Sequence, residues 1–179
     1  MSTPTVDATR KEAAVVLTGA SATRLGDGDA TNALAEVVDR VLAAYVVDGV
    51  GAASAALDLA VAYAKERVQF DRPIGSFQAV QHRCAEMLQL LELGRAGGYY
   101  ALWACDAADG AERHRAATMA KAFAGDAYFR IGASAIQVFG GVGFTWEHDI
   151  HLYYKRLLTL QQVLGGSPEH LEELATIVL

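Results

Sequence analysis

Apolar side chains recur every three or four residues along three long segments of the chain, which is the spacing of one helical face. These segments cover approximately residues 32–70, 77–106 and 111–139. A helix rises 1.5 Å per residue, so a segment of about thirty residues predicts a rod of roughly 45 Å. Rods of this length joined by short loops favour an all-α, up-down four-helix bundle, and residues 150–163 supply part of the fourth rod.

Local signals divide the chain into a start and a bundle. Residues 1–28 are polar or turn-forming and predict a disordered start, with a short β remnant suggested by the Val-Val-Leu run within residues 14–25. The bundle domain is predicted to span residues 29–179. Within it, Ser-Pro-Glu at residues 167–169 predicts the start of a last helix, because it offers a cap, a proline at the first helical position and an acid in the first turn.

Composition excludes several classes of function. The 179 residues carry a net charge of −6 and no basic stripe, which argues against nucleic acid or an anionic membrane surface as the main partner. No apolar stretch is long and uncharged enough to suggest a membrane span, and the first residues lack the hydrophobic segment of a signal peptide. We therefore expect a cytoplasmic protein.

The segment AYAKERVQFDRPIGSFQ, residues 62–78, predicts a corner between the first two helices. The Asp-Arg-Pro turn should end one helix, and Ser76 is the predicted cap of the next. Arg67 and Phe70 would then share a helical face beside a new helix N-terminus, where a phosphate could lie against an aromatic ring. Taken alone, the corner favours a different interpretation, in which Arg67 pairs with a neighbouring acid and Phe70 belongs to the core, because most such arginines are structural.

The segment QVFGGVGFTWEHD, residues 137–149, predicts an open loop after the third helix. Gly140 and Gly141 should leave backbone amides uncovered, with Gln137 one turn earlier, so that a polar ligand or another chain can approach. A glycine-rich loop is weak evidence on its own, because a tight turn between a helix and a loop has the same composition.

A dense polar group follows this loop. A metal site at His148 and His151 has no evident third ligand, so no metal is predicted. A solvated or interface network is favoured, in which Lys155 and Arg156 neutralise the neighbouring acids. The sequence contains no nucleophile motif.

The corner, the segment AKAFAGDAYF and the loop segment IQVFGGVGF together resemble the C-terminal helical domain of the acyl-CoA dehydrogenase family of flavoproteins. They occur in the family's order and spacing, and the resemblance covers about residues 32–179. It implies a four-helix bundle in a tetramer, in which this domain of one subunit touches the flavin adenine dinucleotide (FAD) of its neighbour.

The resemblance also implies roles for six residues at that shared FAD site. Arg67 and Phe70 would meet the pyrophosphate and adenosine side of FAD, and Gln78 would lie near it on the second helix. The residues implied to line the adenine end are Gln137, Gly140 and Gly141.

The chain departs from the family at the catalytic base. The family's glutamate corresponds here to Gly165 or Leu164, depending on one inserted residue, and neither can accept a proton. Some members place the glutamate on the first helix instead, where this sequence has Val41, and Leu42 stands in place of a substrate-binding arginine. Asp39 is nearby but not at the base position. No catalytic residue is therefore predicted.

Two functions remain open. The first is a non-catalytic subunit, or C-terminal piece, of a heteromeric acyl-CoA dehydrogenase of lipid metabolism that completes the FAD site of a partner, which supplies the base and the acyl-CoA pocket. The second is a helical assembly module that binds no flavin. The family's N-terminal domain and most of its β domain are missing, and residues 13–27 resemble the last strands of that domain. Both functions predict a homo-oligomer, or a hetero-oligomer with another acyl-CoA dehydrogenase chain.

Overall fold

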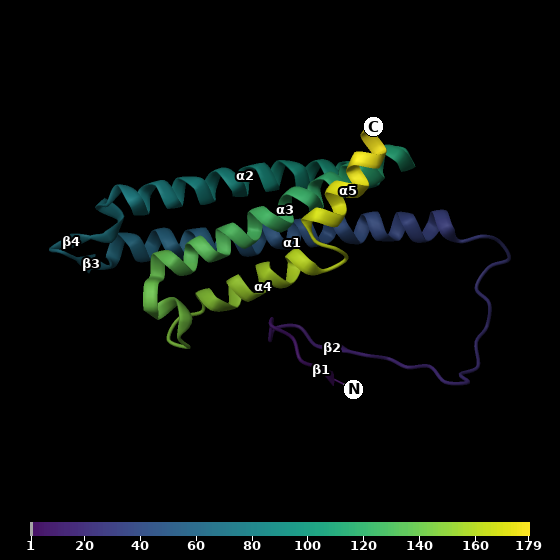
Figure 1. Cartoon of the computed structure of the whole chain (residues 1–179), viewed down its shortest axis with the longest axis horizontal. Helices are drawn as coiled ribbons and strands as arrows, with labels where there is room; N and C mark the ends of the chain where they lie inside the picture. Colours follow the sequence, from purple (N-terminus) through teal and green to yellow (C-terminus); the bar gives the residue numbers. More distant parts are fainter. Residues whose placement is uncertain (1) are drawn as a thin grey trace.

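The computed structural model describes residues 2–179, and their helices form an elongated bundle (Figure 1). The helices are α1 (Thr31–Glu66), α2 (Gln78–Ala107), α3 (Gly110–Phe139), α4 (Ile150–Gln162) and α5 (Ser167–Val178). The first three run up, down and up, α4 lies alongside α1 and α3, and α5 packs on α3. The prediction of an all-α, up-down bundle is confirmed.

The α5 helix begins where the Ser-Pro-Glu sequence predicted, but its cap differs. Gly166, not Ser167, is the N-cap residue, and the Glu169 carboxylate accepts a hydrogen bond of 3.1 Å from the Gly166 N–H. The acid in the first turn therefore supplies the capping interaction, and it also suits the positive end of the helix dipole.

The core is centred on α3, which packs against every other helix. Its Tyr128 side chain is buried, and its hydroxyl donates a hydrogen bond of 2.9 Å to the Val46 carbonyl of α1. Two glycines make room for the ring: a Cβ atom on Gly49 would lie 2.3 Å from it, and one on Gly94 would lie 2.9 Å from it. Gly94 thus allows close helix approach, as expected for a glycine on a buried stripe.

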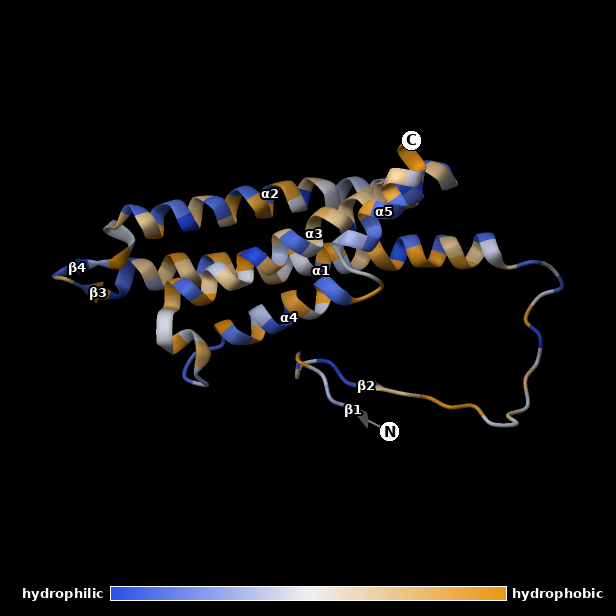
Figure 2. Ribbon diagram, in the orientation of Figure 1, coloured by the Kyte–Doolittle hydropathy of each residue, from blue (hydrophilic) through white to orange (hydrophobic). Residues whose placement is uncertain are grey.

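The N-terminal turns of α1 carry apolar side chains outside the core. Leu34, Val37 and Val38 are 64%, 54% and 45% exposed, and Figure 2 shows these turns extending beyond the other helices. The apolar periodicity that begins at residue 32 therefore does not follow the buried face in this part of α1. Its core face begins with Leu42 and Ala43.

Length and composition alone would allow α1 to cross a bilayer. In its most apolar 18-residue stretch the mean hydropathy is 1.4, and 44% of that stretch is buried inside the protein. The buried face of α1 packs against α2, α3 and α4. This packing gives the apolar residues of α1 a role in the core.

The short strands lie elsewhere than predicted. Strands β1 (Ser2–Thr3) and β2 (Glu12–Ala13) pair with each other, while residues 14–25 are exposed and form no strand. A Val-Val-Leu run has strand propensity, but a strand needs a partner and a covering layer to be stable. The predicted division of the chain after residue 28 stays a prediction.

A polar contact holds the N-terminal segment against the bundle. Asp7 is buried, and its carboxylate accepts a hydrogen bond of 3.2 Å from Arg156, which also reaches Asp48 on α1 at 2.5 Å. Burial raises the pKa of Asp7, but hydrogen bonds from Thr9 and Arg156 outweigh it, so the pKa lies below the usual value. Arg156 therefore binds these two acids rather than the predicted ones beside His148.

Candidate functional site

The corner between α1 and α2 is a small hairpin rather than a continuation of the helix. After α1 ends at Glu66, strands β3 (Val68–Gln69) and β4 (Arg72–Pro73) pair in antiparallel fashion. The Arg67 carbonyl accepts a hydrogen bond of 2.8 Å from the Ile74 N–H, and Phe70 lies at the hairpin tip with a φ of 53°.

The expectation that Arg67 and Phe70 share one helical face is therefore wrong. The chain leaves the helix at Arg67 because hairpin pairing takes over its backbone hydrogen bonds. The first helix thus ends at Glu66, four residues before the end at residue 70 that the sequence predicted.

The hairpin nevertheless presents both side chains to solvent. The Arg67 side chain is exposed and forms no hydrogen bond or ion pair within residues 2–179, and Phe70 is 87% exposed. The Phe70 ring stands edge-on to Phe77 with centroids 6.1 Å apart, and the Arg72 guanidinium lies 4.1 Å from the Phe77 ring centroid. The alternative of a paired Arg67 and a core Phe70 is not what the structure has.

The N-terminus of α2 lacks a side-chain cap. Ser76 does not cap it, because its hydroxyl donates to the Pro73 carbonyl at 2.8 Å, and Phe77 is the N-cap residue. Gln78, the first residue of α2, is exposed. The uncapped first turn leaves backbone N–H groups that suit an anion.

The glycine-rich loop is open where the sequence predicted. The helix α3 ends at Phe139, and Gly140 has a φ of 64°. A Cβ atom placed on Gly140 or Gly141 would meet no atom of the described chain within 4 Å. Gln137 is exposed in the last turn of α3. A ligand could therefore reach the backbone at these glycines.

Ring stacking places the corner and the loop at one end of the bundle. Tyr63 in the last turns of α1 stacks on Phe139, the last residue of α3, with centroids 4.3 Å apart and an interplanar angle of 20°. Figure 1 shows the β3–β4 hairpin and the C-terminal end of α3 at the same end of the molecule. The six residues predicted for FAD contact thus gather at this end, and their contact with FAD stays a prediction.

The turn between α4 and α5 holds Leu164 and Gly165, which the resemblance aligns with the family's base. Leu164 and Gly165 have φ values of 58° and 98°. The buried Lys121 ammonium donates to the carbonyls of Gly165 at 2.8 Å and Gln161 at 3.0 Å, and His170 Nε2 lies 2.9 Å from the Leu164 carbonyl. This turn is held by hydrogen bonds to its backbone, and neither Leu164 nor Gly165 has a side chain that takes a proton.

Sequence reasoning missed Lys121. Burial lowers the pKa of its ammonium to about 8. The sequence did contain a signal, because Lys121 is a single lysine among the alanines Ala120, Ala122 and Ala124. In the structure these three alanines are buried. A charged residue on the buried face of such a helix indicates a specific partner.

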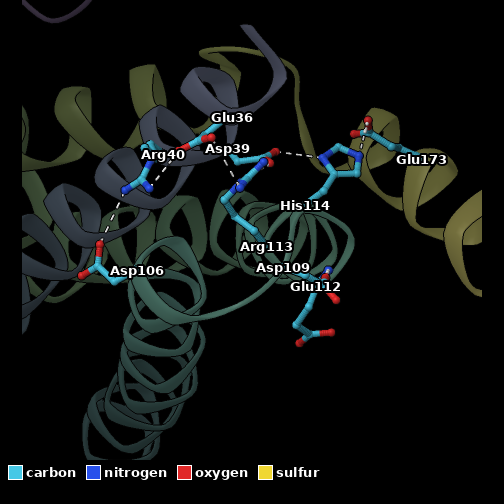
Figure 3. Close-up of polar contacts among 9 residues, drawn as sticks. All are labelled: Glu36, Asp39, Arg40, Asp106, Asp109, Glu112, Arg113, His114 and Glu173. Carbon is cyan, nitrogen blue, oxygen red and sulfur yellow. Dashed lines mark hydrogen bonds and ion pairs between the residues drawn. The ribbon is translucent and has the colours of Figure 1, made fainter. Parts of the chain in front are cut away.

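The alternative base position that the resemblance implies, on α1, holds Val41 beside the buried Leu42, and Val41 cannot accept a proton. The nearest carboxylate, Asp39, is buried and engaged by two α3 side chains (Figure 3). Arg113 Nε donates to it at 3.1 Å, and His114 Nδ1 lies 2.8 Å from its other oxygen. Asp39 therefore joins α1 to α3.

The two histidines after the glycine loop make separate contacts. His148 packs its ring on Phe139 with centroids 4.3 Å apart, and its Nδ1 accepts the Ile150 N–H at 3.1 Å. His151 is buried beside Trp146, edge-on, at 4.5 Å. Within residues 2–179 no three His, Cys, Asp or Glu side chains are grouped so as to hold a metal ion.

Comparisons with known proteins bear on this geometry. The family profile described as "Acyl-CoA dehydrogenase, C-terminal domain" matches residues 30–178. Acyl-CoA dehydrogenase IpdE2 of Mycolicibacterium smegmatis is 41% identical over 171 residues, which cover 96% of this chain and 50% of the relative. This chain thus spans about half the length of that relative.

Solved structures share the fold. A variant of the Tcur3481–Tcur3483 steroid ACAD superposes with a TM-score of 0.80 at 30% identity, covering 83% of this chain and 40% of the other. PigA, solved with FAD and proline, superposes with a TM-score of 0.70 at 27% identity, covering 76% of this chain and 35% of the other. The matched family is one of FAD-dependent oxidoreductases. The chain belongs to the acyl-CoA dehydrogenase family, and its helical bundle is that family's C-terminal domain.

Proposed function

We propose that this chain is a non-catalytic part of an acyl-CoA dehydrogenase assembly and completes the FAD site of a partner chain. One observation carries the proposal. An unpaired, exposed Arg67 and an open glycine loop lie at one end of the bundle, while both positions that would hold the base lack a carboxylate. The binding surface is thus kept without the proton-abstracting group.

The residues present fit the dinucleotide. The Arg67 guanidinium can hold a pyrophosphate through two parallel hydrogen bonds, and the exposed Phe70 ring offers an apolar surface beside it. Gln78, the first residue of α2, would contact the same side of the cofactor. At the adenine end, Gln137 and the open backbone at Gly140 and Gly141 offer hydrogen-bonding groups.

The chemistry of α,β-dehydrogenation explains why we propose that this chain contributes to the FAD site while a partner chain supplies the base. Bound FAD would provide the hydride acceptor for the β-carbon of the thioester, and a base would have to take the α-proton. Gly165 and Leu164 leave that proton without an acceptor in this chain, so the base must come from elsewhere in the assembly. Similarity to the Tcur3481–Tcur3483 steroid ACAD, which is named for two proteins, favours a second acyl-CoA dehydrogenase chain as partner and a steroid-derived acyl-CoA as the first substrate to test.

The test compares the chain alone with the chain co-purified from its native host. We expect no dehydrogenation of acyl-CoA by the chain alone with an artificial electron acceptor, and a flavin spectrum in the co-purified assembly. Turnover by the isolated chain would refute the non-catalytic role. Fractionation of host cells would check the expected cytoplasmic location.

Arg67 gives the proposal a residue-level test. We expect Arg67→Ala to lower the flavin content of the assembly roughly tenfold, since a charge-assisted bidentate contact contributes on the order of 1.5–3 kcal/mol. Arg67→Lys should restore little, because an ammonium cannot bind bidentately. Arg24→Ala, in the exposed segment before α1, is the matched control. Flavin content equal in all three variants would remove Arg67 from the site.

A helical assembly module without flavin is the second candidate. It is favoured by the apolar side chains that α2 leaves exposed, which include Leu88, Leu93 and Trp103. The two functions differ in the visible spectrum of the co-purified assembly. An assembly that forms but stays colourless after incubation with FAD would support the module.

A further inference from the structure

A small cavity with aromatic walls lies beside the glycine loop and apart from the corner. Its volume is about 190 Å³. The end of α3, the 3-10 turn Gly140–Phe144, the start of α4 and the N-terminal segment line it, and it is partly open to solvent. We call it the Trp146 cavity, and its walls are Val6, Ile136, Phe144, Trp146, His151, Tyr154 and Lys155.

His151 gives this cavity an unsatisfied polar group. The side chain is 6% exposed, and its Nδ1 is buried with no hydrogen-bond partner in residues 2–179. Burying a polar atom without a partner costs free energy, so such atoms in folded proteins usually mark a missing water or ligand. The centroids of the His151 and Trp146 rings are 4.5 Å apart and the two planes are nearly perpendicular, at 79°. This contact fixes the imidazole in the cavity wall.

Lys155 gives the cavity a positive rim. Its ammonium lies 5.0 Å from the centroid of the Trp146 ring and forms no ion pair within the described chain. Trp146 and Phe144 are 79% and 76% exposed, which is unusual for rings of this size. An unpaired cation beside two exposed rings and a buried imidazole favours a flat ligand with a negative charge.

We propose that the Trp146 cavity binds a small planar anion of the aromatic carboxylate type. An apolar cavity of about 150 Å³ in another protein holds one benzene molecule, so the present volume fits a single ring with one small substituent. The ring would lie against Trp146, the carboxylate would pair with Lys155, and His151 would satisfy its free nitrogen on the ligand or on a bound water. None of the wall residues is among the six proposed FAD contacts, and the volume is far below that of a whole dinucleotide.

The chain contains two tryptophans, which allows a direct optical test. Trp103→Phe leaves Trp146 as the only tryptophan, and Trp146→Phe leaves the distant Trp103 of α2. We expect benzoate to change the emission of the Trp103→Phe protein saturably, and to leave that of the Trp146→Phe protein unchanged. If no saturable change appears up to about 10 mM benzoate, the dissociation constant is above that concentration, which corresponds to a binding free energy weaker than roughly 3 kcal/mol. That result would overturn the proposal.

Three further titrations of the Trp103→Phe protein test the chemistry of the site. Lys155→Met, which keeps the apolar stem, should weaken benzoate binding roughly tenfold because it removes a charge-assisted contact. His151→Phe should weaken it as well while keeping the wall aromatic, and circular dichroism should show that both variants keep their helices. Benzyl alcohol, the neutral analogue, should bind to the Trp103→Phe protein no more tightly than benzoate binds to the variant that also carries Lys155→Met. Equal affinity for benzoate and benzyl alcohol, or displacement of benzoate by adenosine monophosphate, would contradict a separate anion site.

Discussion

Gly165 and Lys121 determine the path of the chain between α4 and α5. Gly165 has a φ of 98°, a backbone conformation that L-residues with a side chain rarely adopt. Its carbonyl accepts a hydrogen bond from the buried Lys121. The resemblance aligns this turn with the family's base, and in the structure the turn has a backbone conformation held by a hydrogen bond.

Gly165→Ala should destabilise the protein by about 1–2 kcal/mol, the usual cost of a left-handed conformation for a residue with a side chain. The added Cβ atom would also lie 3.2 Å from His170 Nε2. Urea denaturation measures the change. Gly141→Ala is the control, because its Cβ atom would meet open space and its φ is outside the left-handed region. Equal losses in the two variants would show that the Gly165 conformation is not strained.

Lys121 predicts a pH dependence of stability. Burial lowers its pKa from 10.5 to about 8. Between these two values the unfolded chain binds more protons than the folded one, so the contribution of Lys121 to stability rises with pH. It is lost as the pH falls from 10.5 to 8, by up to about 3 kcal/mol for a shift of this size.

The measurement is the free energy of unfolding of the wild-type protein minus that of Lys121→Met, taken across this pH range. We expect the difference to grow with pH, because the other titrating groups are common to both proteins. Lys65→Met, in the exposed last turn of α1, should show no such trend. A flat difference for Lys121→Met would mean that its ammonium is not held as the structure has it.

At the scale of elements, α3 determines the spacing of the bundle. Tyr128 extends from α3 between α1 and α2, with Gly49 on one side of its ring and Gly94 on the other. Its hydroxyl is anchored to the Val46 carbonyl, and burial raises the pKa of this hydroxyl well above its usual value. The ring cannot move far without breaking that hydrogen bond, so both glycines are required at contact distance.

Gly49→Ala should therefore destabilise the bundle by about 1–3 kcal/mol through overpacking, since the new methyl group would overlap the Tyr128 ring. Gly51→Ala provides a control two residues away on the same helix, where a Cβ atom would meet nothing within 4 Å. Alanine is the better helix former, so this control should gain up to about 1 kcal/mol. Thermal denaturation distinguishes the two, and a gain in both variants would contradict the close packing.

Long-range regularity made the helices predictable, and local turn chemistry made the corner hard to predict. The bounds of α2 and α3 lie within a few residues of those expected, because a repeat maintained over thirty residues averages out local exceptions. At the corner, a single early exit from the helix at Arg67 reorients both predicted site residues. Periodicity cannot reveal where a hairpin replaces the last turn of a helix, because the hairpin spans too few residues to change the repeat of apolar side chains, and helix ends are the least certain part of a helix.

The predicted site shows the same division. The openness at Gly140 and Gly141 followed from glycine chemistry in the sequence and is present in the structure. The burial of Lys121 and of Asp7 depends on which helices and segments meet, so it could not be read from their neighbours in the chain. The contacts of Arg156 with Asp7 and Asp48 join residues more than a hundred positions apart.

At the scale of the whole molecule, α2 has apolar residues on its outer surface as well as on its inner one. Its buried glycine stripe, including Gly94 and Gly98, faces α3 and α1. The exposed apolar residues are other ones, namely Leu88, Leu93, Tyr99, Leu102 and Trp103. An exposed apolar surface of this kind favours association with another chain.

We therefore expect the chain to be a homo-oligomer, or a hetero-oligomer with another acyl-CoA dehydrogenase chain, and light scattering should give a mass above the 19.0 kDa of one chain at micromolar concentration. Leu93→Glu should weaken association at least about tenfold, because a carboxylate buried in an apolar contact loses its hydration without gaining a partner. Leu93 is 51% exposed, so the fold itself should tolerate the change. Val16→Glu, at a residue 84% exposed in the segment before α1, adds the same charge outside the bundle and should leave the mass unchanged. A mass of 19.0 kDa for the wild-type chain, both when purified alone and when isolated from its native host, would refute the assembly, because the exposed residues of α2 would then remain in water in every state of the protein.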